Sequence, residues 1–169
     1  MLYKMSAVKK VLQVVLISML AVNAHSISLE GTWQEDKDRT IQWNSANTKV
    51  DPERLDKLGL ILGHYYIKYK NGMACGFFEP YTFEYEGEVR EVPRLSTNLS
   101  KYEVVAENEF GYVIKTTGTD QTETIDVLIF EGEESFYGIR LDAEDFGFQG
   151  GRIYFKKVET VRWDFDCAN

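Results

Sequence analysis

The sequence contains few of the residues that build catalytic and metal sites. Its 169 residues include only two histidines and two cysteines. His25 and His64 have no partner at the spacing of a metal-ligand set, so we expect neither a metal nor another cofactor. No serine lies in a G-x-S-x-G turn, and no glycine-rich phosphate loop leads into a helix. These absences favour a protein that is not an enzyme.

Positive charge is also scarce. The chain has 19 Lys and Arg residues against 27 Asp and Glu residues, which gives a net charge of −8 and a pI of about 4.9. Nucleic-acid binding relies on a basic surface, so we expect no nucleic-acid partner. Hydrophobic residues make up 44% of the chain and aromatic residues 14%, which is enough to build the core of one globular domain.

The first 24 residues have the pattern of a secretory signal peptide. Three lysines precede an apolar run over residues 11–22, and Val22-Asn23-Ala24 fits a cleavage site. An uncleaved membrane anchor is the alternative, but this run is shorter than the roughly 20 residues that a span needs. We expect cleavage after Ala24, which removes three lysines and no acid and lowers the net charge from −8 to −11. The mature chain has no further apolar run long enough to span, and we expect it to be soluble, in the periplasm or secreted.

Both cysteines, Cys75 and Cys167, lie in the mature chain. An oxidising compartment favours a disulfide between them, which would fasten the C-terminal tail to the body of the protein. Such a bridge closes a loop of about 90 residues and stabilises the fold by at most about 4–5 kcal/mol in the chain-entropy model. Two free, buried thiols are the alternative.

The hydrophobic pattern alternates with a period of two along most of the chain. Short alternating runs begin at Gly31-Thr32-Trp33 and at residues 40–43, and longer ones follow from residue 64 onward. Asn71-Gly72 is the strongest hairpin signal because both turn positions tolerate a positive φ angle. Later runs cover residues 73–86, 102–107, 110–116, 122–130, 135–141 and 152–158.

One short helix interrupts this pattern. Asp51 is a good N-cap, Pro52 fits the first helical position and Glu53 suits the positive end of the helix dipole. Gly59 or Gly63 would end the helix. Because a long meander must cover or close its edges, we predict an all-β fold: an antiparallel up-and-down β-barrel of about eight strands, with one short helix after the first strand. Residues 25–169 then form a single domain.

The segment Leu29-Glu30-Gly31-Thr32-Trp33 resembles the G-x-W motif that opens lipocalin-like (calycin-type) barrels. The resemblance implies that Gly31 allows a tight entry to the first strand and that Trp33 closes one end of the barrel. It also implies an arginine packed over that tryptophan, for which Arg152 is the candidate and Arg140 and Arg162 are alternatives. The same family often ties its C-terminal tail to the barrel wall by a disulfide, as Cys75 and Cys167 would do here.

Five tyrosines fall on strand faces that we assign to the barrel interior. They are candidates for lining a pocket, in which rings supply apolar area and hydroxyls supply orientation. Ordinary packing of a barrel, in which tyrosine is enriched by β-propensity, is the alternative. The five are Tyr65, Tyr69, Tyr102, Tyr112 and Tyr137.

Two functions of different class follow. The first is an exported, soluble, non-enzymatic binding protein for a small apolar or amphipathic molecule, which the G-x-W start, the meander and the inward aromatic residues favour. The alternative is a periplasmic inhibitor or immunity protein that neutralises a secreted enzyme or toxin. Strong negative charge speeds the encounter with a basic protein partner. The sequence leaves the oligomeric state open.

Overall fold

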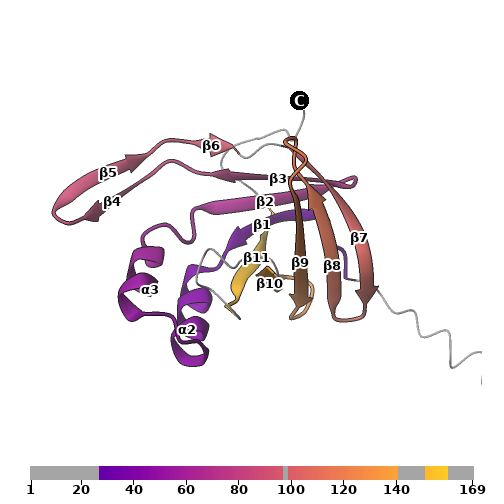
Figure 1. Cartoon of the computed structure of the whole chain (residues 1–169), viewed down its shortest axis with the longest axis horizontal. Coiled ribbons are helices and arrows are strands. Elements are labelled where there is room, and N and C mark those ends of the chain that lie inside the picture. Colours follow the sequence, from indigo (N-terminus) through magenta and orange to yellow (C-terminus); the bar gives the residue numbers. More distant parts are fainter. Residues whose placement is uncertain (1–26, 97–98, 141–150, 160–169) are drawn as a thin grey trace, which may run out of the picture.

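A computed structural model describes residues 27–96, 99–140 and 151–159. The predicted signal peptide and its cleavage site lie outside the described residues. The described part contains two helices and eleven strands (Figure 1). In chain order they are β1 (Gly31–Glu35), α2 (Lys37–Asn47), α3 (Pro52–Gly59), β2 (Tyr65–Lys70), β3 (Met73–Phe78), β4 (Tyr81–Tyr85), β5 (Glu88–Val92), β6 (Leu95–Ser96), β7 (Ser100–Asn108), β8 (Gly111–Thr117), β9 (Glu123–Phe130), β10 (Ser135–Arg140) and β11 (Ile153–Val158).

Eight of these strands close into an antiparallel barrel. The order around the barrel is β1, β2, β3, β7, β8, β9, β10 and β11, and β11 pairs with β1 again. The predicted all-β barrel is therefore confirmed. Asn71 and Gly72 join β2 to β3 with φ angles of 53° and 74°, as the hairpin signal predicted.

The helical region differs from the prediction. The predicted helix is α3, in which the Asp51 side chain accepts the Glu53 N–H at 2.9 Å. Residues 40–43, which the alternating pattern assigned to a strand, belong instead to a second helix, α2. Asp36 caps α2 by accepting the N–H of Arg39 at 3.2 Å. The expectation of a single helix was therefore wrong.

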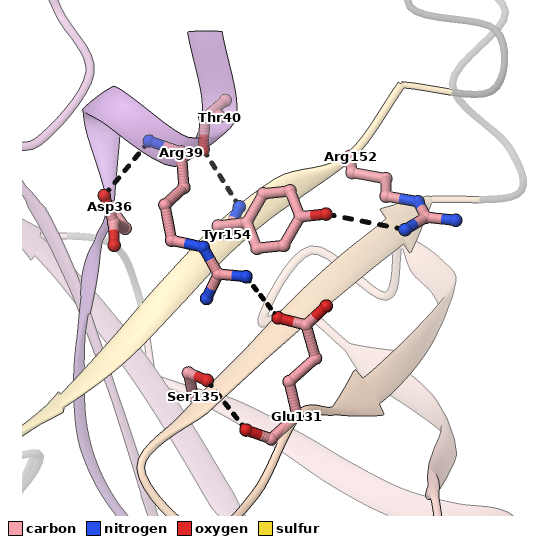
Figure 2. Close-up of polar contacts among 7 residues, drawn as sticks. All are labelled: Asp36, Arg39, Thr40, Glu131, Ser135, Arg152 and Tyr154. Atoms are coloured by element: carbon pink, nitrogen blue, oxygen red, sulfur yellow. Dashed lines mark hydrogen bonds and ion pairs between the residues drawn. The ribbon is translucent and has the colours of Figure 1, made fainter. Parts of the chain in front are cut away.

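Helix α2 covers the part of β11 that extends past the end of β1. The Tyr154 carbonyl still accepts the Asp36 N–H at 2.7 Å, and the Tyr154 N–H donates to the Thr40 hydroxyl at 3.0 Å (Figure 2). Thr40 and Asn44 are one helical turn apart, and both are buried. The buried face of α2 is thus polar. Its side chains hydrogen-bond to the backbone of β11 where β1 has ended and no longer pairs with it.

Outside the barrel, β4 and β5 form a separate two-stranded sheet. This hairpin extends away from the barrel, to the left in Figure 1. It is followed by β6, which pairs with the end of β3 through Phe77 and Phe78.

The register separates the interior of the barrel from its exterior. Trp33 pairs with Ile67 on β2, and Ile67 pairs with Gly76 on β3, so these residues face inward with Trp33. Nine buried residues form the main core cluster, and three others form a second cluster on the opposite face of β2 and β3. The main cluster is Leu29, Trp33, Tyr69, Ala74, Tyr112, Ile114, Leu128, Phe130 and Phe136, and the second is Tyr66, Cys75 and Phe77.

Candidate functional site

One end of the barrel is filled with aromatic side chains around Trp33. The indole is fully buried and lies edge-on to Phe130 and Phe136, with ring centroids 5.7 and 4.8 Å away. Its Nε1–H donates to the Leu29 carbonyl at 2.9 Å, which holds the segment before β1 across this end. Gly31 has a φ angle of +138°, a conformation that residues with a side chain rarely adopt. Gly31 and Trp33 therefore lie together at this end of the barrel, which we call the closed end.

The cation above Trp33 is a lysine. Lys157 pairs with Trp33 in the sheet, and its Nζ lies 5.5 Å from the centre of the indole. Arg152 precedes β11 and stacks instead on Trp43 and Tyr137, outside the barrel. The expectation that Arg152 packs over Trp33 was therefore wrong, because Arg152 comes five residues before the position on β11 that faces the indole. Of the alternatives, Arg162 and the Arg140 side chain lie outside the described part of the structure.

The other half of the interior contains a cavity of about 250 Å³. It runs along the inward faces of β2, β3 and β7 to the turn between β8 and β9. Hydroxyl groups and aromatic rings dominate its lining. The lining residues are Tyr65, Ile67, Tyr69, Ala74, Cys75, Gly76, Ser100, Thr116, Gly118, Thr122, Thr124 and Asp126.

The cavity lies beside the weakest seam of the barrel. Strands β3 and β7 share only two residue pairs, Met73 with Lys101 and Ala74 with Ser100. Beyond Ala74, β3 diverges from β7 and pairs with β6 near its end. Gly76 and Ser100, which line the cavity, flank the point of divergence. This seam is where the barrel wall has the fewest hydrogen bonds to break when a molecule enters.

The five predicted tyrosines have different places. Tyr65 and Tyr69 line the cavity, and Tyr102 lies edge-on to Tyr69 with the ring centroids 5.3 Å apart. Tyr112 belongs to the packed core, and its hydroxyl donates to the Ile27 carbonyl. Tyr137 was assigned to the wrong face. Its neighbour Phe136 points inward, and Tyr137 packs against Arg152 outside the barrel.

Gly76 leaves room for the ring of Tyr65. A Cβ atom at position 76 would lie 2.6 Å from the Tyr65 ring carbon Cε2 and closer still to the hydroxyl oxygen. The Tyr65 ring therefore lies across the β3 backbone, with a tilted contact to Phe78 at 4.9 Å. The missing side chain at Gly76 sets the position of one wall of the cavity.

Sequence reasoning missed a buried carboxyl group at the end of β1. Glu35 is 9% exposed and accepts the Gly63 N–H at 3.1 Å. Burial raises the pKa of Glu35 to about 7, although hydrogen bonds from the backbone of Gly63 and Tyr65 oppose the shift. Burial, and secondly the charge of Glu35, also raises the pKa of Tyr81. The alternation of Trp33 and Glu35 on β1 was the available signal, since it places both on the inward face.

His64 follows Gly63, whose N–H donates to this carboxyl group. Its ring stacks on Tyr81 with the centroids 3.8 Å apart, and its Nδ1 is 3.8 Å from Glu79 Oε1. Desolvation lowers the pKa of His64. Within the described residues, the buried Nδ1 atom has no hydrogen-bond partner.

Cys75 belongs to the second cluster with Tyr66 and Phe77, and it also contributes to the lining of the barrel cavity. It is 6% exposed, and the described residues include no free cysteine. Leu99 and Val158 pack against the same cluster. Cys167 lies outside the described residues, so its pairing with Cys75 stays a prediction.

Comparison of the chain with protein-family models, with curated proteins and with solved structures yields no match. The likeness to lipocalin-type barrels therefore remains a resemblance. Within residues 27–96, 99–140 and 151–159, neither helix has the length or apolar character to cross a membrane.

Proposed function

We propose that the protein is an exported, non-enzymatic binding protein whose barrel takes up a small amphipathic molecule. The observation that carries this proposal is the uneven filling of the barrel. The half around Trp33 is packed with aromatic rings, and the other half holds a cavity of about 250 Å³. A barrel that served only as a packed scaffold would have no need of such a space.

The lining indicates the kind of ligand. Tyr65, Tyr69 and Ile67 offer apolar area, whereas Ser100 and three threonines offer hydroxyl groups. Hydroxyl groups both donate and accept hydrogen bonds, so they suit an uncharged polar group. Pockets for drug-sized molecules start at about 300 Å³, so the ligand we propose is smaller, with one ring and a hydroxyl or carbonyl group.

A pair of neighbouring threonines on β8 allows a matched test. Thr116 lines the cavity, whereas Thr117 follows it on the opposite face of the strand. Thr116→Phe fills the cavity, and Thr117→Phe adds the same ring outside. Ligand-observed NMR with indole, p-cresol and cyclohexanol measures binding. We expect at least one probe to bind the wild type and the Thr117→Phe variant, and Thr116→Phe to abolish that binding. Absence of binding by all three, or equal binding by both variants, contradicts the proposal.

Export and the disulfide belong to the same proposal. The pattern of residues 1–24 supports a cleaved leader. Cys75 is buried in the cluster with Tyr66 and Phe77 on the outer face of β2 and β3, which supports a C-terminal tail fastened over that cluster. Intact-mass spectrometry of the protein recovered from the periplasm or medium tests both points. We expect a chain starting at His25 that gains no mass on alkylation without a reductant and gains two adducts after reduction.

One feature favours the alternative function, an inhibitor or immunity protein. The β4–β5 hairpin projects from the barrel, and one of its faces is fully exposed (Figure 1). By register this face holds Glu84 opposite Val89, with Glu91 alongside, and Val89 is 73% exposed. An apolar side chain between two carboxylates suits a basic protein surface. The partner we propose in this case is a basic secreted hydrolase or toxin.

Charge reversal on the hairpin separates the two functions. The double variant Glu84→Lys and Glu91→Lys leaves the barrel cavity untouched. If the alternative holds, the wild type inhibits peptidoglycan lysis by a basic muramidase at low salt, and the double variant does not. If neither protein inhibits the enzyme and the cavity still binds its probes, the hairpin is not an inhibitory arm for such a hydrolase.

A further inference from the structure

An arginine is held between two aromatic rings on the outside of the barrel. The guanidinium carbon of Arg152 lies 4.2 Å from the ring centre of Trp43 on α2 and 4.1 Å from that of Tyr137 on β10. We call these three residues the Arg152 clamp. Because a ring covers the guanidinium on two sides, the clamp fixes its position and leaves its N–H edge for hydrogen bonding.

Within the described part of the chain, this edge makes one hydrogen bond. A guanidinium has five N–H donors, and Arg152 Nη1 donates to the Tyr154 hydroxyl at 3.4 Å, a long hydrogen bond (Figure 2). Among the described residues, no carboxylate pairs with Arg152. The neighbouring Arg39, which stacks on the ring of Tyr154, does have a carboxylate partner, Glu131.

A hollow of about 300 Å³ lies next to the clamp, and Arg39, Trp43 and Tyr154 line it. Arg152 lies behind the last two rather than in the lining itself, and it contacts both, so the hollow and the guanidinium share two walls. Gln42 and Asn47 contribute side-chain amides from the exposed side of α2. Figure 2 shows Tyr154 between Arg39 and Arg152. Aromatic walls, amide groups and a guanidinium edge together suit a ring that carries an anionic group.

We propose that the Arg152 clamp and this hollow form a binding site for a small ring-bearing carboxylate. The carboxylate takes the N–H edge of Arg152 in a bidentate pair, and the ring occupies the hollow against Trp43 and Tyr154. The fixed guanidinium loses little conformational freedom when the anion binds, which favours affinity from few contacts. The site is on the outer face of β10 and β11, separate from the barrel cavity, and does not depend on the function proposed for that cavity.

Titration of the purified protein with matched pairs of small molecules tests this site. Benzoate and glucuronate are the carboxylate probes, and benzyl alcohol and glucose are their neutral counterparts; inorganic phosphate tests an anion without a ring. NMR of the ¹⁵N-labelled protein follows the Trp43 indole N–H and the side-chain amides of Gln42 and Asn47. We expect at least one carboxylate to bind more tightly than both its neutral counterpart and phosphate, with shifts confined to these groups.

Arginine variants give the decisive comparison. Arg152→Gln keeps a polar but shorter side chain and removes the charge, and we expect it to weaken carboxylate binding at least about tenfold. Arg90→Gln is the matched control, because Arg90 also stacks on a tyrosine, Tyr85, but lies near Glu88 on the distant hairpin. It should leave the affinity unchanged, and so should Thr116→Phe, which fills the barrel cavity.

Several results would overturn the proposal. One is the absence of binding by both carboxylates at about 10 mM, the range of very weak association. Others are equal binding of the neutral counterparts, phosphate binding as tight as that of the carboxylates, or an Arg152→Gln variant that binds as the wild type does. Near-ultraviolet circular dichroism of each variant checks that it is folded, and Arg152→Lys, which keeps the charge without the planar fork, provides a second variant of intermediate affinity.

Discussion

The Asn44 side chain pairs with the backbone of Arg152 as a neighbouring strand would. Its Nδ2 donates to the Arg152 carbonyl at 2.7 Å, and its Oδ1 accepts the Arg152 N–H at 3.1 Å. Asn44 is fully buried, and its side chain shields the partly buried backbone groups of Arg152 from water. The pair completes the sheet edge at the point where β1 has already turned into α2.

Replacing Asn44 should therefore cost far more than its helix position suggests. Asn44→Ala leaves two partly buried backbone groups of Arg152 without this partner, and we expect a loss on the order of 2–3 kcal/mol in the free energy of unfolding. Urea denaturation measures it. Asn47→Ala is the control, because Asn47 lies three residues further along α2 on its exposed side. This variant removes a hydrogen bond to the Trp43 carbonyl within the same helix and should cost less than about 1 kcal/mol. Similar losses in the two variants would show that the pairing of the Asn44 side chain with the Arg152 backbone contributes little to stability.

The same contact explains why α2 escaped prediction. A helix is recognised from an apolar stripe, but the buried face of α2 consists of Thr40 and Asn44. Their partners, Arg152 and Tyr154, lie just before β11 and on it, more than 100 positions away in the chain. No local sequence pattern therefore indicates these contacts. By contrast, α3 was predictable because Asp51 and Pro52 are local signals of a helix start.

The barrel itself was predictable, but the direction of single side chains was not. The hairpin at Asn71-Gly72 needs only its own two residues, and closure follows from the need to cover edges. Phe136 and Tyr137 are neighbours on β10 and therefore face opposite sides of the sheet. Because both are aromatic, the hydrophobic pattern does not decide which of them faces inward. Arg152 was misplaced for a similar reason, since the resemblance fixed the type of contact on Trp33 but not the residue on β11 that reaches it.

Gly76 and Gly111 should respond differently to the same substitution. A Cβ at position 76 would overlap the end of the Tyr65 side chain, which can move. A Cβ at position 111 would lie 3.0 Å from the Leu128 carbonyl carbon and closer to its oxygen, and that backbone cannot move without breaking the sheet. We expect Gly76→Ala to cost about 1–3 kcal/mol and Gly111→Ala to cost more.

A double-mutant cycle checks the cause at Gly76. In a Tyr65→Ala background the obstructing ring is gone, so the added cost of Gly76→Ala should fall below about 0.5 kcal/mol. Denaturant unfolding of the four proteins of the cycle provides the coupling energy. If Gly76→Ala costs the same in both backgrounds, the glycine is required by something other than the tyrosine ring.

At the closed end, Trp33 and Lys157 should differ in what they contribute. Trp33→Phe removes the hydrogen bond to the Leu29 carbonyl and part of a fully buried ring, and we expect a loss of about 2–3 kcal/mol. Lys157→Met keeps a long side chain over the indole and removes the cation–π contact alone, which should cost about 0.5–1 kcal/mol. Thermal unfolding ranks the two. Lys157→Arg should retain the contact, and a loss as large as that of Trp33→Phe would contradict this role for Lys157.

The buried carboxyl group of Glu35 should make stability depend on pH. Its pKa is raised from 4.5 to about 7 in the folded protein. Below about pH 4.5 the group is protonated in both the folded and the unfolded chain. Between pH 4.5 and pH 7 the unfolded chain gives up its proton while the folded protein still holds it, so the free energy of unfolding falls as pH rises. Above pH 7 both states are ionised, and the loss, on the order of 3 kcal/mol, is complete.

Glu35→Gln removes this dependence while it keeps an oxygen that can accept the Gly63 N–H. The variant should match the wild type near pH 4.5 and should become progressively more stable than it up to pH 7, with a constant advantage above that pH. Urea denaturation at a series of pH values measures the difference. Glu91→Gln, at an exposed position on β5, is the control for the loss of one carboxylate and should follow the wild-type curve. A Glu35→Gln protein whose stability falls with pH as steeply as that of the wild type would show that Glu35 is already ionised throughout this range, and that its burial is offset by the backbone N–H groups around it.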